Sequence, residues 1–220
     1  MKINYEKETL HAYQSDNRAQ DYKDFHTKQL SWGRFVTFIE HQKIAKELRK
    51  HSWASSDRLL DIPCGTGILG KLLHDFHFKI TASDISTEMM GLARDEYPTD
   101  YPVEFKQADI TNTEFQQDYF SCVITLGFLH RVPLDIKKST LQEIYRLTSK
   151  VAIISCSVDT PLQRLKHKIL SIVKPNHVPA PCPATLKEII DVCQKSGFRV
   201  KRSFMVLPLL SSDALLVLEK

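Results

Sequence analysis

The sequence has no uninterrupted apolar run of about 18 residues, the length that a membrane-spanning helix requires. Its first residues also lack the apolar segment that follows the basic start of a secretory signal. The 5 cysteines are odd in number and never form a C-x-x-C pair, which argues against a disulfide framework or a zinc site. We therefore expect a cytoplasmic protein with reduced thiols and no bound metal.

The sequence also has little excess of one charge sign. It contains 30 Lys and Arg and 26 Asp and Glu, and the basic residues are spread along the chain, so nucleic acid is not the expected partner. Internal repeats and low-complexity tracts are absent. With 220 residues, of which 42% are hydrophobic, the chain is long enough to form one domain with its own core.

Short apolar runs and helical patterns alternate from about residue 56 onward. This alternation is typical of strand-helix units that build a parallel sheet with helices on both faces. We expect strands at 57–62, 79–84, 103–109, 120–126 and 151–157. We expect the helices between them at 66–76, 87–97 and 139–150.

The C-terminal part predicts one more helix and two more strands. A helical pattern covers 184–198, with Gly197 placed as its cap. The β-like runs FRVKRSFMVL and DALLVLEK follow, joined by PLLSS, a linker that suits a hairpin. The sequence therefore predicts an α/β fold: a doubly wound seven-stranded sheet, mostly parallel, with an antiparallel C-terminal hairpin.

Two segments lie outside the alternation. Residues 1–55 are polar and helical in pattern, and 157–183 interrupt the chain between the fifth strand and the last helix. The segment 161–173 places apolar residues on one helical face and basic residues elsewhere. That insertion is interpreted as a cap packed on the edge of the sheet. Alternatively, its basic face meets an anionic substrate or an acidic membrane surface.

The stretch LLDIPCGTGILG, residues 59–70, carries three glycines with the spacing G-x-G-x-x-G. Such a turn lets a ligand approach the backbone at a helix N-terminus, and it fits a dinucleotide or S-adenosylmethionine. Asp84 follows Gly65 by about twenty residues, where an acid at the end of the second strand can bind a ribose.

Asp61 distinguishes between the two cofactors. It is expected at the end of the first strand, directly before the glycines. A carboxylate there would repel the pyrophosphate of a dinucleotide, but it would attract the ammonium group of a bound methionine. Asp109, after the third strand, is placed to meet an adenine amino group, with Ile85 and Ile110 around the ring.

LLDIPCGTG, SDISTEMM, ADI and TLGFLHRV together resemble the motif series of class I S-adenosylmethionine-dependent methyltransferases, over about residues 56–156. The resemblance implies a Rossmann-like fold, a methyltransferase domain at 56–220 and a helical lid at 1–55. It implies a cofactor site whose residues are Asp61, Gly65, Thr66, Gly67, Asp84, Ile85, Met89, Asp109, Ile110 and Leu126, with Arg18 and Tyr22 from the lid.

The methyl acceptor is expected beside the loop after the fourth strand. We assign Phe128, His130, Arg131 and His177 to its site. His130 can act as a general base, because its ordinary pKa is near neutral, or it can be a structural histidine that fixes the loop. A small or lipid-like acceptor is expected, since no separate recognition domain is visible.

Other functions remain open on the sequence alone. A nicotinamide-dependent reductase is supported only by the glycine spacing, and the chain has no Y-x-x-x-K pair. Methylation of a nucleic-acid base is disfavoured, because GFLH stands where an N-P-P-Y motif would be. A protein acceptor and a non-catalytic cofactor-binding protein are both compatible with the motifs.

Overall fold

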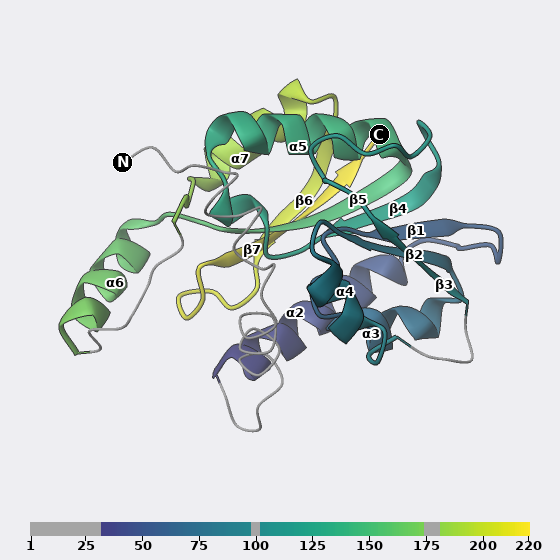
Figure 1. The fold of residues 1–220 in the computed structure, drawn as a ribbon. Coiled ribbons are helices and arrows are strands. Elements are labelled where there is room, and N and C mark those ends of the chain that lie inside the picture. Colours follow the sequence, from purple (N-terminus) through teal and green to yellow (C-terminus); the bar gives the residue numbers. More distant parts are fainter. Residues whose placement is uncertain (1–31, 98–101, 174–180) are drawn as a thin grey trace.

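The computed structural model describes residues 32–97, 102–173 and 181–220 (Figure 1). Its strands are β1 Arg58–Asp61, β2 Lys79–Asp84, β3 Val103–Gln107, β4 Phe120–Thr125, β5 Thr148–Ser157, β6 Arg199–Met205 and β7 Asp213–Glu219. They form one sheet in the order β3-β2-β1-β4-β5-β7-β6. The first five pair in parallel, and β7 is antiparallel to both β5 and β6. The predicted seven-stranded sheet with an antiparallel C-terminal hairpin is confirmed.

Helices cover both faces of this sheet. Their bounds are α2 Trp32–Leu48, α3 Gly70–Leu73, η2 His74–Phe76, α4 Thr87–Ala93, η3 Leu129–Arg131, α5 Leu134–Leu147, α6 Pro161–Val173 and α7 Leu186–Lys195. α5 and α7 lie on one face, and α2, α3 and α4 lie on the other (Figure 1). Since the strand order reverses direction between β1 and β4, ligands are expected at the carboxyl ends of these strands.

The sheet separates two hydrophobic cores. Successive side chains of a strand point to opposite faces, so the two leucines of β1 enter different cores. Leu60 packs in the core that contains Leu141 of α5, whereas Leu59 packs in the core that contains Ile44 and Leu48 of α2. All five side chains are fully buried. This explains why the central strands are apolar without alternation.

The described part of the predicted lid is α2. Its last turns are core, because Ile44, Ala45 and Leu48 are buried against the sheet. Its first turns are different, since the rings of Trp32 and Phe35 are exposed. Residues 1–31, and with them Arg18 and Tyr22, lie outside the described residues.

Several predicted boundaries were wrong. The helix expected at 139–150 begins earlier, at Leu134, and ends at Leu147, because residues 148–150 already belong to β5, where Thr148 pairs with Phe120. The helix expected at 66–76 is reduced to α3 and η2, because the residues before Gly70 form the glycine turn.

The two ends of the insertion 157–183 lie side by side, just beyond the carboxyl end of β5. Val158 forms a parallel bridge with Ala184, and the amide of Asp159 donates to the carbonyl of Ala184 at 3.0 Å. Cys182 is fixed as well, since its N–H donates to the carbonyl of His130 at 2.9 Å and its own carbonyl accepts from Lys137 Nζ at 2.7 Å. The two ends of the insertion are therefore fastened together.

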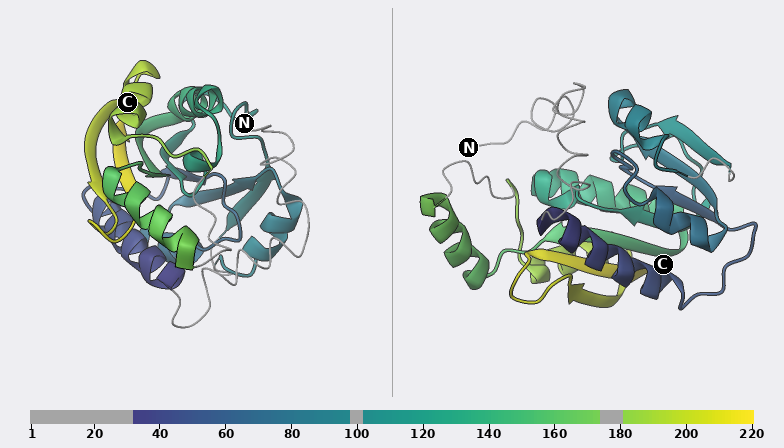
Figure 2. Two further views of the ribbon diagram at one scale, coloured as in Figure 1. Left: turned by 90° about the vertical axis from the view of Figure 1, so that its left-hand side faces the viewer. Right: turned by 90° about the horizontal axis from the view of Figure 1, so that it is seen from below.

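α6, between those ends, projects from the body of the molecule (Figure 2). The side chains of Leu162, Leu165 and Ile169 are each at least 44% exposed. The expected packing of this apolar face on the sheet edge is therefore not seen in the described residues. In the described residues, the insertion is attached to the sheet at its two ends, and α6 extends beyond them (Figure 2).

Four of the cysteines, Cys64, Cys122, Cys156 and Cys193, have buried, free thiols. Cys64, inside the glycine turn, is buried, and burial together with nearby Asp84 raises its pKa well above the usual value, so it is a packed thiol. In the part of the chain that the structure describes, no helix is long and apolar enough to cross a bilayer. Over the same ranges, no three His, Cys, Asp or Glu side chains are arranged to hold a metal ion.

Candidate active site

A glycine turn joins β1 to α3 at the carboxyl edge of the sheet. Gly65 has φ +53° and Gly67 has φ +77°, left-handed conformations that residues with a side chain rarely adopt. The N–H of Gly67 donates to the carbonyl of Cys64 at 2.9 Å. A Cβ on Gly67 would lie 2.8 Å from the carbonyl oxygen of Ala93 in α4. The turn is thus packed against α4 with no space for a side chain.

Asp84 connects this turn to the end of β2. One of its carboxylate oxygens accepts from the N–H of Gly65 at 2.9 Å, and the other accepts from the N–H of Ser86 at 2.9 Å. Burial raises the pKa of Asp84 above its ordinary value, and these two bonds oppose the shift. A carboxylate oxygen has more than one acceptor direction, so the predicted contact with a ribose is compatible with both bonds.

Asp61 lies at the end of β1 and is only 2% exposed. Its Oδ2 accepts a 2.5 Å hydrogen bond from the hydroxyl of Tyr97, which follows α4. Burial raises the pKa of Asp61 to about 7; the bond from Tyr97 lowers it, and the nearby charge of Asp84 raises it. Burial destabilises the ionised form of this carboxyl, and a cation placed beside the carboxylate would stabilise that form.

Asp109 is held in a local turn. Its Oδ1 accepts from both the N–H and the hydroxyl of Thr111, each at 2.8 Å. Ile110 packs into the core beside α5, whereas Ile85 remains partly exposed at the end of β2. The structure thus gives Asp109 a turn-forming role, and its contact with an adenine stays a prediction.

The other predicted cofactor residues lie around the same edge. Thr66, within the turn, is buried, and among the described residues its hydroxyl has no hydrogen-bond partner. Met89 is buried in the first turn of α4, and its N–H donates to Ser86 Oγ at 3.1 Å. Leu126 directly follows β4 and is half-buried. His177 lies outside the described residues.

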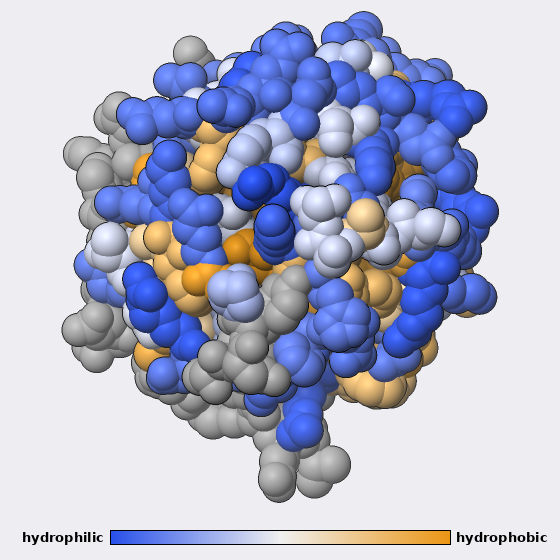
Figure 3. Space-filling model, turned by 90° about the vertical axis from the view of Figure 1, so that its right-hand side faces the viewer, coloured by the Kyte–Doolittle hydropathy of each residue, from blue (hydrophilic) through white to orange (hydrophobic). Residues whose placement is uncertain are grey.

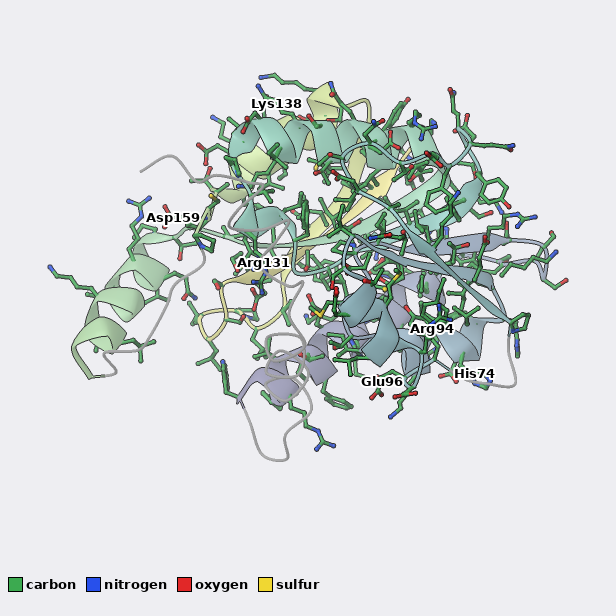
Figure 4. All side chains as sticks on the ribbon, in the orientation of Figure 1. His74, Arg94, Glu96, Arg131, Lys138 and Asp159 are labelled. Atoms are coloured by element: carbon green, nitrogen blue, oxygen red, sulfur yellow. The ribbon has the colours of Figure 1, made fainter. Side chains whose placement is uncertain are left out.

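A pocket of about 240 Å³ opens next to the glycine turn. Its wall is formed by one side of α2, Ile68 of the turn, the loop after β4, η3, β5 and the start of β7. Leu126, which was predicted to contact the cofactor, and His130 and Arg131, which were predicted to contact the acceptor, line this pocket. In Figure 4, Arg131 and Asp159 lie on the side of the molecule from which α6 projects, away from Arg94, Glu96 and His74.

Three of the residues predicted for the acceptor site, His130, Arg131 and Phe128, differ from one another in their surroundings. Burial, followed by the charge of Arg131, lowers the pKa of His130 to about 4, and its buried Nδ1 has no hydrogen-bond partner in the described ranges. Arg131 donates from Nε to the carbonyl of Gly127 at 2.8 Å. Phe128 is buried in the core with Leu129, because η3 turns its ring inward.

Sequence reasoning missed four residues of this region. Tyr97 contacts Asp61 from 36 positions further along the chain, and no local pattern marks such a pair. Glu40, Ser155 and Asp213 line the pocket from three separate elements. Burial, and then the charge of Asp213, raise the pKa of Glu40 to about 8. Only the assembled sheet brings these groups together.

Residues 59–150 match a family model described as a methyltransferase domain. The demethylmenaquinone methyltransferase of Clavibacter sepedonicus is 32% identical over 108 residues, covering 49% of this chain and 43% of that protein. A malonyl-(acyl-carrier protein) O-methyltransferase of Anoxybacillus flavithermus is 34% identical over 99 residues, covering 44% of this chain and 37% of that protein. The chain thus spans less than half the length of these curated relatives.

A solved structure gives a more complete match. Magnesium protoporphyrin IX methyltransferase from Synechocystis PCC 6803, crystallised with bound SAH, superposes with a TM-score of 0.78 and 17% identity. The superposition covers 94% of this chain and 96% of that chain. At this identity the likeness establishes the fold, including the β7 and β6 hairpin at its edge.

Proposed function

The chain carries a class I S-adenosylmethionine-dependent methyltransferase domain, and on this premise we propose that it transfers a methyl group from that cofactor to a small-molecule acceptor. The observation that carries the proposal is the buried carboxyl of Asp61 beneath the glycine turn. A dinucleotide would place its pyrophosphate near this acid at an electrostatic cost, whereas a methionine ammonium would be attracted.

The residues present fit the cofactor. Gly65 and Gly67 leave the turn without side chains, Asp61 would hold the ammonium group, and Asp84 would hold the ribose. Asp109 and Ile85 would contact the adenine. When bound, S-adenosylmethionine supplies a methyl carbon that its positive sulfur already activates. The protein then has to orient the acceptor and exclude water.

Calorimetric titration with S-adenosylmethionine and S-adenosylhomocysteine tests the cofactor assignment. Binding of both is expected, and tight binding of a reduced nicotinamide cofactor in their place would overturn it. A cell extract is then incubated with the protein and a donor that carries a trideuteromethyl group. A metabolite that gains this group supports transfer, whereas cofactor binding without any labelled product would indicate a non-catalytic binding protein.

A hydrophobic or lipid-like acceptor is the finer part of the proposal. Exposed apolar side chains belong to α6, to Leu209 and Leu210 after β6, and to Trp32 of α2, which also lines the pocket. α6, the β6–β7 connection and the start of α2 lie on one side of the molecule (Figure 1). The face at the amino ends of the parallel strands is mainly hydrophilic (Figure 3). The relatives named for demethylmenaquinone and malonyl-(acyl-carrier protein) agree with an acceptor that is not a nucleic acid. The segments 1–55 and 157–183 would flank the entrance.

Replacing Leu162, Leu165 and Ile169 together by serine is expected to slow methylation of a lipid extract by at least about fivefold, equivalent to roughly 1 kcal/mol. The physical reason is the lost apolar area that would contact the acceptor. Labelled product in the organic-solvent phase measures the rate. Leu134→Ser, at another exposed leucine, is the control and should keep the rate. Equal rates for the triple variant and the control would contradict a lipid-like acceptor.

Tyr97→Phe is expected to raise the pH at which the cofactor begins to bind. The hydroxyl of Tyr97 lowers the pKa of Asp61, and its removal leaves the buried acid protonated up to a higher pH. Affinity for the ammonium group should therefore rise with a midpoint near 7 in the wild type and about one unit higher in the variant. Calorimetric titration across pH 5 to about 9 measures this. An unchanged midpoint would show that Asp61 does not hold the cation.

A further inference from the structure

Three polar side chains from distant parts of the chain meet in the wall of the pocket. They are Glu40 of α2, Ser155 of β5 and Asp213 at the start of β7. The hydroxyl of Ser155 accepts the N–H of Gly127 at 2.9 Å, and its interaction with the carboxyl of Glu40 lowers the pKa of that acid. The Gly127 bond uses only the oxygen of Ser155, so the hydroxyl proton is available to Glu40.

Asp213 is held apart from this bond. Its two carboxylate oxygens accept from the hydroxyls of Ser157, at 2.9 Å, and Ser211, at 2.6 Å. It therefore acts on Glu40 through its charge. Two carboxyl groups that line one pocket cannot both ionise without a cost in free energy, so one of them retains its proton more strongly.

Among the described residues, the charged and titratable groups that line the pocket with Glu40 are Asp213, His130 and Arg131. Burial and the charge of Asp213 raise the pKa of Glu40 to about 8, and the bond from Ser155 lowers it. His130 has the opposite shift, because burial lowers its pKa to about 4, which makes its imidazole a weak base. Of these groups, Glu40 has the proton affinity that suits proton transfer near neutral pH.

We propose that Glu40 is the catalytic residue that receives the proton of the methyl acceptor, that Ser155 positions it, and that the attacked group is therefore one that loses a proton on methylation, such as a hydroxyl or an amine, and not a carboxylate. This inference rests on the proposed function. It goes beyond it by naming the chemical class of the attacked group. A carboxylate acceptor has no proton to give, and the pair of acids would repel it.

A lone pair of the acceptor forms the new bond to the methyl carbon, and the bond between that carbon and the donor sulfur breaks with its electron pair on sulfur. The acceptor proton passes to the ionised carboxyl of Glu40. Loss of this proton to water through the open side of the pocket restores the carboxylate.

The first test follows the pH dependence of the trideuteromethyl product formed from cell extract. The wild-type rate should rise through a midpoint near 8. Glu40→Gln should lose at least about 100-fold in rate together with this rise, while the dissociation constant for S-adenosylmethionine stays within about twofold. Asp213→Asn should move the midpoint to lower pH, because it removes the charge that favours the protonated form. Glu47→Gln, the same change further along α2, is the control.

A pH profile of Glu40→Gln equal to that of the wild type would overturn the inference while leaving the proposed function standing. Complete absence of labelled product would instead count against the proposed function. The two failures are thus distinguishable.

The second test needs no natural acceptor. Phenol, aniline and benzoate are titrated by NMR into the protein saturated with S-adenosylhomocysteine, at a pH above 8. Phenol and aniline should bind at least about tenfold more tightly than benzoate, and Glu40→Gln should reduce this difference. Benzoate binding as tightly as phenol would overturn the assignment of the attacked group, even if no labelled product is found.

Discussion

Gly67→Ala is expected to destabilise the fold by about 2–4 kcal/mol and to weaken S-adenosylmethionine binding at least about tenfold. Gly67 has φ +77°, and a Cβ there would lie 2.8 Å from the carbonyl oxygen and 2.9 Å from the Cα of Ala93. Both are backbone atoms, so the turn or α4 has to shift. Urea unfolding and calorimetric titration measure the two effects.

Gly91→Ala is the matched control. Gly91 is exposed in α4, and a Cβ there would meet no atom within 4 Å. Alanine is the better helix former, so this change should stabilise the fold by about 0.5–1 kcal/mol and leave cofactor affinity unaltered. If the two variants unfold at the same urea concentration, the contact between the glycine turn and α4 is not as close as the structure has it.

Asp61→Asn is expected to weaken S-adenosylmethionine binding by about 100-fold, roughly 2.7 kcal/mol, because it removes the only negative charge that we assign to the methionine ammonium. Asparagine keeps an oxygen that can accept the bond from Tyr97, so the local structure should persist. Titration with S-adenosylmethionine at pH 8 measures the loss.

The same variant should be more stable than the wild type when no cofactor is bound. The pKa of Asp61 is about 7 in the folded protein and ordinary in the unfolded chain, so the folded state binds the proton more tightly. Its contribution to stability is therefore complete below about pH 4 and is lost as the pH rises through 7. Thermal unfolding should show an advantage of Asp61→Asn at pH 8 that disappears near pH 4.

Asp191→Asn is the control for this experiment, since that carboxyl lies in an exposed ion pair with Lys195. Its loss should change stability by no more than about 0.5 kcal/mol at either pH. An Asp61→Asn protein that binds the cofactor as well as the wild type would remove the main support for the proposed cofactor site.

The sheet could be predicted because its strands are short and bounded by turn residues. The two consecutive leucines of β1 also indicate a strand that is buried on both faces of the sheet. The C-terminal hairpin was predicted for a similar reason, since PLLSS is too short for a crossover helix. The early start of β5 at Thr148 was not predicted, because the pairing of Thr148 with Phe120 depends on a strand that is distant in sequence.

The cofactor site was predictable to the extent that it lies at strand ends. Asp61 and Asp84 each end a parallel strand, and parallel strands bring their carboxyl ends to one edge. No position at the end of a parallel strand distinguishes Tyr97, Glu40 and Asp213 in the sequence. They reach the same edge from a helix end, an N-terminal helix and an antiparallel strand, so only tertiary contacts reveal them.

The attachment of both ends of the insertion has a consequence for how this protein can diversify. The bridge between Val158 and Ala184, and the bonds of Cys182 to His130 and Lys137, fix both ends without help from α6. The stretch of chain between these two ends can therefore vary without loss of their attachment. A change of its length or composition would leave both attached ends and the sheet in place, so under the proposed function a new acceptor could be accommodated by exchanging this one stretch of chain.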